Sequence, residues 1–378
     1  MDEIAVYDKY IRKYEAAGAL KAKTFGEVLE EAAEKYADNI AFVDRSRRTT
    51  YREFKQRVDN LSAGMYRLGL RKADNILLQM PNCIEFMEVL FACLQIGIRP
   101  VLVLPTHREN EVRAFAKLLA PKAYITTDKY MGYDYCALAL KVKEMCPAIE
   151  YIISDKKCKG TTHLETLYDD PMQINENVQY KETALYLLSG GTTGTPKLIP
   201  KTHTAYITNA YLSAKRCEFD KDTVYMAILS IAHDYPLCSP GVLGAFCNGA
   251  KSVLGYNPDC DEIFEMIEKE RVTTVSIVPA IANVWMEYLE YEEDYEFQTL
   301  SKLIVGASKL EENLGKELIK KFQCTIYQGY GLGEGITCFT KSSDSLEVQL
   351  NTQGRPISEY DEIKIVDSFG SAMPGGVW

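Results

Sequence analysis

The sequence predicts an α/β fold in which two lobes of mixed or parallel β-sheet are covered by helices. Short, almost continuously apolar segments alternate with helical patterns, which is typical of strands buried on both faces. A polar interval, 155–182, divides the alternation into two similar halves. With 378 residues, the chain is also longer than one simple core usually supports. We therefore expect a first lobe over 1–182, a second over 183–350 and the start of a small β-rich subdomain over 351–378.

The first half opens with two helices that carry the same N-terminal signal. Thr24 and Glu27 stand in the register of a capping box, and Thr50 and Glu53 repeat it. The expected helices cover 24–36, 50–70, 83–97, 109–120 and 137–145, and the expected strands cover 40–44, 75–80, 99–105, 123–127 and 149–154.

The second half resumes the alternation after a glycine-rich segment. The expected strands cover 198–200, 223–229, 252–256, 273–279, 302–307 and 325–331, and the expected helices cover 204–217, 241–247, 261–272, 281–291 and 311–322. The tail, 361–378, has the pattern of a further strand followed by a turn. Its last residues predict that the chain stops within a β-rich region.

Composition excludes several classes of protein. A net charge of −10 argues against nucleic acid as the main partner, because a phosphate backbone requires a concentrated basic face. No apolar run reaches the roughly 18–20 residues that span a bilayer, and the acidic, amphipathic start is unlike a secretory signal. The 11 cysteines are scattered, without metal-ligand spacing. We expect a cytoplasmic protein with reduced thiols, without nucleic acid or membrane as partner.

The segment 187–203, LLSGGTTGTPKLIPKTH, has the composition of a loop that holds phosphate. Small residues let backbone N–H groups approach, hydroxyls donate hydrogen bonds, and Lys197 adds charge. The phosphate-binding candidates are Ser189, Gly190, Gly191, Thr192, Thr193 and Gly194. Pro196 separates this loop from the nucleotide-binding P-loop, in which the lysine leads directly into a helix. A glycine-rich hairpin with incidental threonines remains the alternative.

The loop resembles the signature loop of the adenylate-forming superfamily, which includes acyl-CoA synthetases, luciferases and peptide-synthetase adenylation domains. Gly190 stands where that pattern usually has serine, and Leu198 where it has glycine. Four further segments resemble elements of the family in the same order: 232–241, 305–308, 327–335 and 351–356.

The resemblance implies an ATP site built from these segments. Tyr330 and Gly329 would lie on one face of adenine, and the backbone of Gly306 and Ala307 on the other. Glu334 would hold Mg²⁺ against the ATP phosphates. Gly333 departs from the pattern, since a phosphate-contacting threonine is common there. The alternatives are structural: Tyr330 as a core aromatic and Glu334 as a solvated side chain.

The resemblance is greatest to aryl-acid–AMP ligases of the 2,3-dihydroxybenzoate and salicylate type. It implies that His233 gates the acyl site, although a satisfied structural histidine is the alternative. Asp234, Tyr235, Ser239 and Ile336 would line the acyl pocket. That subgroup usually has Asn where this chain has Asp234, and the amino-acid-activating branch uses Asp there. Because a carboxylate accepts hydrogen bonds or pairs with a cation, we expect an aromatic acid carrying an amino or hydroxyl group.

The implied reaction joins the acid to the α-phosphorus of ATP, releases pyrophosphate and leaves an acyl-AMP. Lys197, Glu334 and His233 are the candidate catalytic residues. A thiol of coenzyme A or of a carrier-protein phosphopantetheine would then accept the acyl group. In the family a C-terminal lid carries a further catalytic lysine, and we expect this chain, without it, to turn over weakly. Three alternatives remain: an amino-acid-activating domain, a kinase or ATPase, and a non-catalytic ATP- and acyl-binding module.

Overall fold

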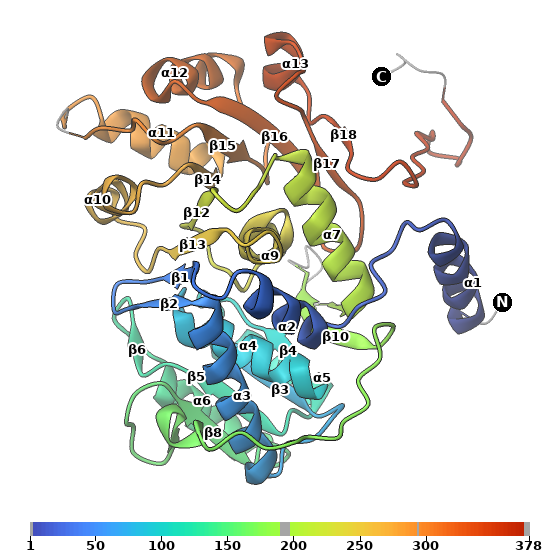
Figure 1. Ribbon diagram of the computed structural model, residues 1–378, viewed down its shortest axis with the longest axis vertical. Helices are drawn as coiled ribbons and strands as arrows, with labels where there is room; N and C mark the ends of the chain where they lie inside the picture. The colour runs from blue at the N-terminus through green and yellow to red at the C-terminus, as the bar shows by residue number, and fades with distance from the viewer. Residues whose placement is uncertain (1–2, 190–196, 293–294, 374–378) are drawn as a thin grey trace.

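The computed structural model describes residues 3–189, 197–292 and 295–373. Two β-sheets alternate with three layers of helices, so that the order is helix–sheet–helix–sheet–helix (Figure 1). Inward- and outward-facing residues alternate along each strand, as the period of a strand requires. On β3, for example, Ile76 and Leu78 face the central core while Leu77 faces an outer one. The predicted α/β fold with two covered sheets is confirmed.

The seven-stranded sheet has the order β11-β10-β4-β3-β5-β8-β9, and only the β10–β11 pair is antiparallel. Its strands are β3 (Asn75–Gln79), β4 (Arg99–Leu102), β5 (Ala123–Thr126), β8 (Tyr151–Ser154), β9 (Thr162–His163), β10 (Thr183–Leu188) and β11 (Leu198–Thr202).

The nine-stranded sheet has the order β18-β17-β16-β15-β14-β12-β13-β1-β2, with a parallel centre and antiparallel edges. Its strands are β1 (Ile40–Val43), β2 (Arg48–Thr50), β12 (Val224–Ala227), β13 (Lys251–Leu254), β14 (Thr274–Ile277), β15 (Lys302–Val305), β16 (Thr325–Gly331), β17 (Thr337–Phe339) and β18 (Arg355–Pro356). A separate hairpin joins β6 (Lys129–Tyr130) to β7 (Tyr133–Asp134).

The central helices lie between the sheets and contribute to the largest apolar cluster. They are α2 (Phe25–Lys35), α3 (Tyr51–Leu68), α4 (Ile84–Ile96), α7 (His203–Arg216) and α9 (Gly241–Cys247). The outer helices are α5 (Glu109–Leu119) and α6 (Tyr135–Met145) on the seven-stranded sheet, and α10 (Cys260–Glu270), α11 (Pro279–Tyr288) and α12 (Glu312–Phe322) on the nine-stranded sheet. The remaining helices are α1 (Glu3–Ala16), η1 (Leu164–Leu167), α8 (Asp234–Cys238) and α13 (Leu346–Asn351).

Sheet membership does not follow the expected boundary at residue 182. β1, from the first half of the chain, pairs in parallel with β13, and β10, from the second half, pairs in parallel with β4. Each half therefore contributes two strands to the other half's sheet: β1 and β2 extend the nine-stranded sheet, and β10 and β11 extend the seven-stranded sheet. The division into domains stays a prediction, but the two halves are connected by strand exchange as well as by side-chain packing.

Local signals at the helix starts are confirmed, whereas the strand expected in the tail is not formed. Thr24 and Thr50 both make reciprocal capping boxes with the glutamates three residues later. Between 361 and 373 the structure has only an isolated bridge, Val366 to Ala372. Within the described ranges no neighbouring strand forms a ladder with this segment, so its alternating pattern alone does not make a strand. Among the described residues, no helix combines the length and the hydrophobicity needed to cross a bilayer.

His203, at the start of α7, makes fold stability depend on pH. The His203 side chain is 1 % exposed and its Nδ1 accepts a hydrogen bond of 3.2 Å from the Phe25 N–H. Burial lowers the pKa of His203 to about 4, below its ordinary 6.5. Between pH 6.5 and pH 4, His203 is therefore protonated in the unfolded chain and neutral in the folded chain. The free energy of unfolding consequently decreases as the pH falls through this range.

We expect lowering the pH from 7 to 5 to cost about 2 kcal/mol of unfolding free energy through this histidine. In His203→Asn, which keeps a neutral acceptor, that contribution should vanish. Urea unfolding of both proteins at pH 7 and pH 5 gives the loss of unfolding free energy in each. The loss in the wild type minus the loss in His203→Asn is the contribution of the histidine. An equal pH dependence in the two proteins would contradict the assignment.

Candidate active site

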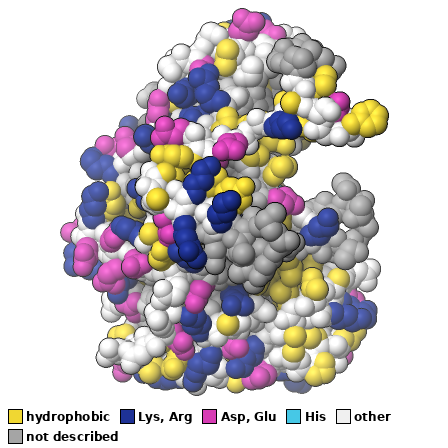
Figure 2. Space-filling view, turned by 90° about the vertical axis from the view of Figure 1, so that its right-hand side faces the viewer, with side chains coloured by type: hydrophobic (Ala, Val, Ile, Leu, Met, Phe, Trp, Pro, Cys, Tyr) yellow, Lys and Arg dark blue, Asp and Glu magenta, His cyan; other side chains and the backbone are white. Residues whose placement is uncertain are grey.

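A cavity of about 310 Å³ lies where strands of the two sheets end beside each other. Leu102 ends β4, Leu188 ends β10 and Gly331 ends β16, and all three line the cavity. Carboxyl ends of parallel strands are the usual location of ligand sites in α/β folds. Figure 2 shows that the face carrying both termini is notched, with hydrophobic and acidic side chains on the wall of the notch. The fold thus provides a concave site between its two sheets.

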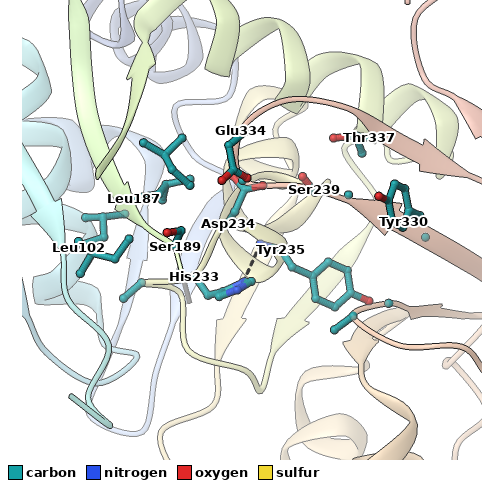
Figure 3. A pocket seen from close by; sticks show the side chains of 18 of the residues that line it. Leu102, Leu187, Ser189, His233, Asp234, Tyr235, Ser239, Tyr330, Glu334 and Thr337 are labelled. Atoms are coloured by element: carbon teal, nitrogen blue, oxygen red, sulfur yellow. Dashed lines mark hydrogen bonds between the residues drawn. The ribbon is translucent and has the colours of Figure 1, made fainter. Parts of the chain in front are cut away.

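Ten of the predicted site residues meet in this cavity (Figure 3). They are Ser189, His233, Asp234, Tyr235, Ser239, Gly306, Ala307, Gly329, Tyr330 and Glu334. Ile336 lines an adjoining cavity of about 760 Å³, which shares Asp234, Glu334 and Thr337 with the first. Positions far apart in the chain therefore converge on one space.

His233 caps the short helix α8 and faces the cavity. Its Nδ1 accepts a hydrogen bond of 3.2 Å from the Tyr235 N–H (Figure 3). Burial lowers the pKa of His233, and the neighbouring Asp234 charge opposes this only in part. The imidazole is therefore neutral near pH 7 with its proton assigned to Nε2, since Nδ1 is occupied as an acceptor. His233 can donate one hydrogen bond into the site.

Asp234 is the next residue of α8 and lines both cavities. Burial raises the pKa of its carboxyl group, and the Lys201 charge and the Tyr206 hydroxyl oppose this rise. The Tyr206 hydroxyl donates to Asp234 Oδ1 at 2.8 Å. Figure 3 shows the side chains of Asp234 and Glu334 directed into the same space. Two carboxyl groups therefore share one wall of the site.

Tyr235 and Ser239 contribute different chemistry to the cavity. The Tyr235 hydroxyl donates to the Ile304 carbonyl at 2.7 Å and lies 3.2 Å from the Ile277 carbonyl. The hydroxyl proton is therefore committed to the ends of β14 and β15 and is not available to a ligand. Ser239, which is 6 % exposed, accepts a 3.1 Å hydrogen bond from Asn209 Nδ2 and keeps its own hydroxyl proton.

The predicted adenine wall consists of backbone next to an open aromatic ring. A Cβ on Gly329 would lie 2.3 Å from the Phe339 ring, so a side chain has no room there. Ala307 has a φ of 67°, in the left-handed region that non-glycine residues rarely adopt, and such positions concentrate at functional sites. The Tyr330 side chain is 43 % exposed, which leaves its ring accessible for stacking on a base.

The glycine-rich loop connects β10 to β11, and its two ends lie together. The Ser189 N–H donates to the Lys197 carbonyl at 3.0 Å, and the Lys197 N–H donates to Ser189 Oγ at 3.3 Å. Five of the predicted phosphate-binding residues lie outside the described residues: Gly190, Gly191, Thr192, Thr193 and Gly194. The lysine precedes a strand, as Pro196 predicted, and does not lead directly into a helix as the P-loop lysine does. The Lys197 side chain is exposed and is not part of the described cavity lining.

Glu334 is suited to a divalent cation held together with phosphate. Its carboxylate is exposed to both cavities and lies in the same lining as the Ser189 hydroxyl. The described part of the chain contains no cluster of three potential metal ligands. Mg²⁺ commonly binds through one or two carboxylates plus phosphate oxygens and waters, and this donor set fits that arrangement.

Comparison with known proteins identifies the family. Residues 29–377 match the family described as AMP-binding enzyme. The chain belongs to this family. It is 39% identical over 369 residues to the 2,3-dihydroxybenzoate-AMP ligase of Bacillus subtilis, covering 98% of this chain and 68% of that protein. It is 35% identical to the salicyl-AMP ligase / salicyl-S-ArCP synthetase of Mycobacterium tuberculosis, covering 96% and 65%. The apo structure of Mycobacterium smegmatis MbtA superposes with a TM-score of 0.90 at 34% identity, covering 97% and 67%.

This AMP-binding enzyme also has candidate site residues that the sequence did not indicate. The Tyr206 hydroxyl donates to Asp234, the Asn209 amide donates to Ser239, and the Thr337 hydroxyl donates to Asn209. The charge of Lys201 lowers the pKa of Asp234, against the rise caused by burial. Tyr206 and Asn209 stand three residues apart on one helix, a spacing that places two side chains on one face. That spacing, directly after the signature loop, is the signal that could have found them.

Proposed function

We propose that this protein uses ATP and Mg²⁺ to convert an aromatic carboxylic acid into an acyl-AMP, with release of pyrophosphate. The observation that carries the proposal is the convergence of Asp234, Ser239, Tyr330 and Glu334 on one cavity. One end offers polar groups for a small acid and the other offers a stacking ring for a base. The family and the names of the aryl-acid ligase relatives support this assignment.

The chain's own residues act by positioning and by charge. The Tyr330 ring and the backbone of Gly306 and Ala307 would orient adenine, and Ser189 would donate to a phosphate oxygen. Neutral His233 would donate through Nε2 to an oxygen that gains charge as the acid attacks the α-phosphorus. Glu334 would hold Mg²⁺, which supplies positive charge to the phosphates when bound. Lys197 would neutralise the departing pyrophosphate.

A third cavity supports transfer of the acyl group to a thiol. This cavity, of about 370 Å³ and mostly apolar lining, lies on the other side of His233 and Tyr235. This cavity and the 310 Å³ cavity share four lining residues, which therefore lie between them: Leu104, His233, Tyr235 and Ala307. A slender thiol-bearing arm from coenzyme A or a carrier protein could approach the acyl end by this path. We propose a phosphopantetheine thiol as the acceptor, in agreement with the carrier-protein synthetase among the relatives.

The second candidate is activation of an amino acid, which Asp234 favours because its carboxylate could pair with an ammonium group. ATP–pyrophosphate exchange over a panel of benzoates and amino acids separates the two candidates. Exchange with benzoates alone supports the proposal, and exchange with amino acids alone replaces it by the second candidate. Release of ADP and phosphate would identify a kinase or ATPase instead.

The substitution Asp234→Asn tests the role of Asp234 in selecting the acid. Asparagine both donates and accepts, whereas the carboxylate accepts only, so preference should move from aminobenzoates toward ortho-hydroxybenzoates. A change of one hydrogen bond to a charged group predicts a selectivity shift of about tenfold or more. The ratio of kcat/KM for 2-aminobenzoate and 2-hydroxybenzoate in the exchange assay measures it. An unchanged ratio would mean that Asp234 does not contact the amino or hydroxyl substituent of the acid.

A further inference from the structure

Helix α7 lies beside the acyl end of the cavity and presents two polar side chains to residues that line it. Tyr206 and Asn209 are three residues apart, so both project from one face of the helix toward α8 and Ser239. Both line the adjoining cavity, which also contains Asp234 and Thr337. Neither belongs to a segment that resembles a family motif, and the function proposed above assigns no role to them.

Tyr206 leaves Asp234 with one free oxygen. The Tyr206 side chain is 1 % exposed and packs edge-on against Phe25, with ring centroids 6.4 Å apart, so the phenol is held in place. Its hydroxyl donates to Asp234 Oδ1 at 2.8 Å. An ionised carboxylate accepts hydrogen bonds only. Asp234 therefore presents Oδ2 to a ligand as an acceptor with a defined direction.

Asn209 leaves Ser239 with a free proton. Asn209 Nδ2 lies 3.1 Å from the Cys238 carbonyl oxygen, which can only accept, and Asn209 Oδ1 lies 3.0 Å from Thr337 Oγ1. These two contacts determine which end of the amide is the NH₂ group. The same Nδ2 lies 3.1 Å from Ser239 Oγ and donates to it. Ser239 accepts from Asn209, so its O–H is directed to a ligand as a donor.

We infer that Tyr206 and Asn209 are positioning residues that determine the hydrogen-bond polarity of the acyl pocket. This inference rests on the proposed function, because it takes Asp234 and Ser239 as the residues that contact the acid. The pocket then selects an aromatic acid with a donor group toward Asp234 and an acceptor atom toward Ser239. An acid that lacks one of these groups leaves Asp234 Oδ2 or the Ser239 hydroxyl without a hydrogen-bond partner. Such an unpaired polar group lowers the affinity for the wrong acid more than a lost apolar contact does.

Two conservative variants test the inference by equilibrium binding. Tyr206→Phe removes one hydroxyl and keeps the ring, and Asn209→Leu removes the amide and keeps similar volume. The probes are benzoate, aminobenzoates and methoxybenzoates, titrated in the presence of an ATP analogue that cannot release pyrophosphate. Tyr206→Phe should weaken binding of aminobenzoates about five- to tenfold relative to benzoate, and Asn209→Leu should do the same for methoxybenzoates. Lys215→Gln, on an exposed turn of α7, serves as the matched control.

Double-mutant cycles separate positioning from general loss of structure. The Tyr206→Phe effect should disappear in an Asp234→Ala background, which removes the acceptor of the Tyr206 hydroxyl, and the Asn209→Leu effect should disappear in a Ser239→Ala background. In the exchange assay the change should fall on the KM for the aryl acid, with kcat and the KM for ATP unchanged. Additive effects in both cycles, or equal weakening of all three probes, would overturn the inference.

Failure of the inference is distinguishable from failure of the proposed function. Wild-type protein that binds no benzoate in any form would refute the proposed function and the inference together. Wild-type protein that binds benzoates selectively, with the same selectivity in both variants, would refute the inference alone.

Discussion

Glu334→Gln is expected to slow acyl-AMP formation by about a hundredfold, because it removes the charged ligand proposed to hold Mg²⁺ at the ATP phosphates. Glutamine has nearly the same shape, and the Glu334 side chain is exposed to the cavity, so the fold should not change. The rate of ATP–pyrophosphate exchange as a function of Mg²⁺ concentration measures the effect. The mutant should require more Mg²⁺ for half-maximal rate as well as having a lower maximum.

Glu144→Gln is the matched control for this prediction. Glu144 is an exposed glutamate on α6, which covers the outer face of the seven-stranded sheet, away from the cavity. Its exchange rate and Mg²⁺ dependence should equal those of the wild type. If Glu334→Gln also kept both, Glu334 would be a solvated side chain with no part in catalysis.

Glu88→Gln is expected to lower the free energy of unfolding by about 2–3 kcal/mol, because it removes the charge that two arginines share, although each arginine keeps a second carboxylate partner. Glu88 lies on α4 with 0 % exposure. Its Oε1 accepts from Arg47 Nη2 at 2.9 Å and from Arg57 Nε at 2.8 Å, and its Oε2 accepts from the Tyr168 hydroxyl. One carboxylate thereby joins the β1–β2 turn, α3 and the segment after η1 to α4.

Urea unfolding measures this prediction, with the midpoint compared at unchanged m-value. Glu144→Gln again serves as the control and should shift the free energy by less than about 0.5 kcal/mol, as exposed substitutions usually do. A loss below about 1 kcal/mol in Glu88→Gln would mean that the network contributes no more than a surface ion pair.

Local order followed directly from local patterns in this chain. Capping boxes at Thr24 and Thr50, the apolar strands and the strand after Lys197 were all predictable, because each depends on residues close together in sequence. The tail, 361–373, has a similar pattern without a pairing partner and forms no strand. A strand requires a partner strand from elsewhere in the chain to complete its hydrogen bonds. An alternating apolar pattern is therefore not sufficient to form one.

The candidate site was partly predictable for the same reason. Asp234, Ser239, Tyr330 and Glu334 stand in short segments that resemble family motifs, and the structure brings them into one cavity. Tyr206 and Asn209 carry no such signal, because their importance comes from what α7 faces after folding. The buried charge of Glu88 was equally hidden, since the segment 83–97 indicates only an apolar helix.

The sequence by itself determined the α/β class, most helix and strand positions and the chemical groups of the site. Hydrophobic periodicity and capping act over a few residues and can be recognised along the chain. Only the tertiary structure decided that β1 joins β13 and β10 joins β4, and that the Tyr235 hydroxyl is bound to backbone. It also decided that Asp234 and Ser239 present opposite hydrogen-bond polarity. Such pairings depend on which backbone or side chain lies opposite, and that is established only when distant segments pack together.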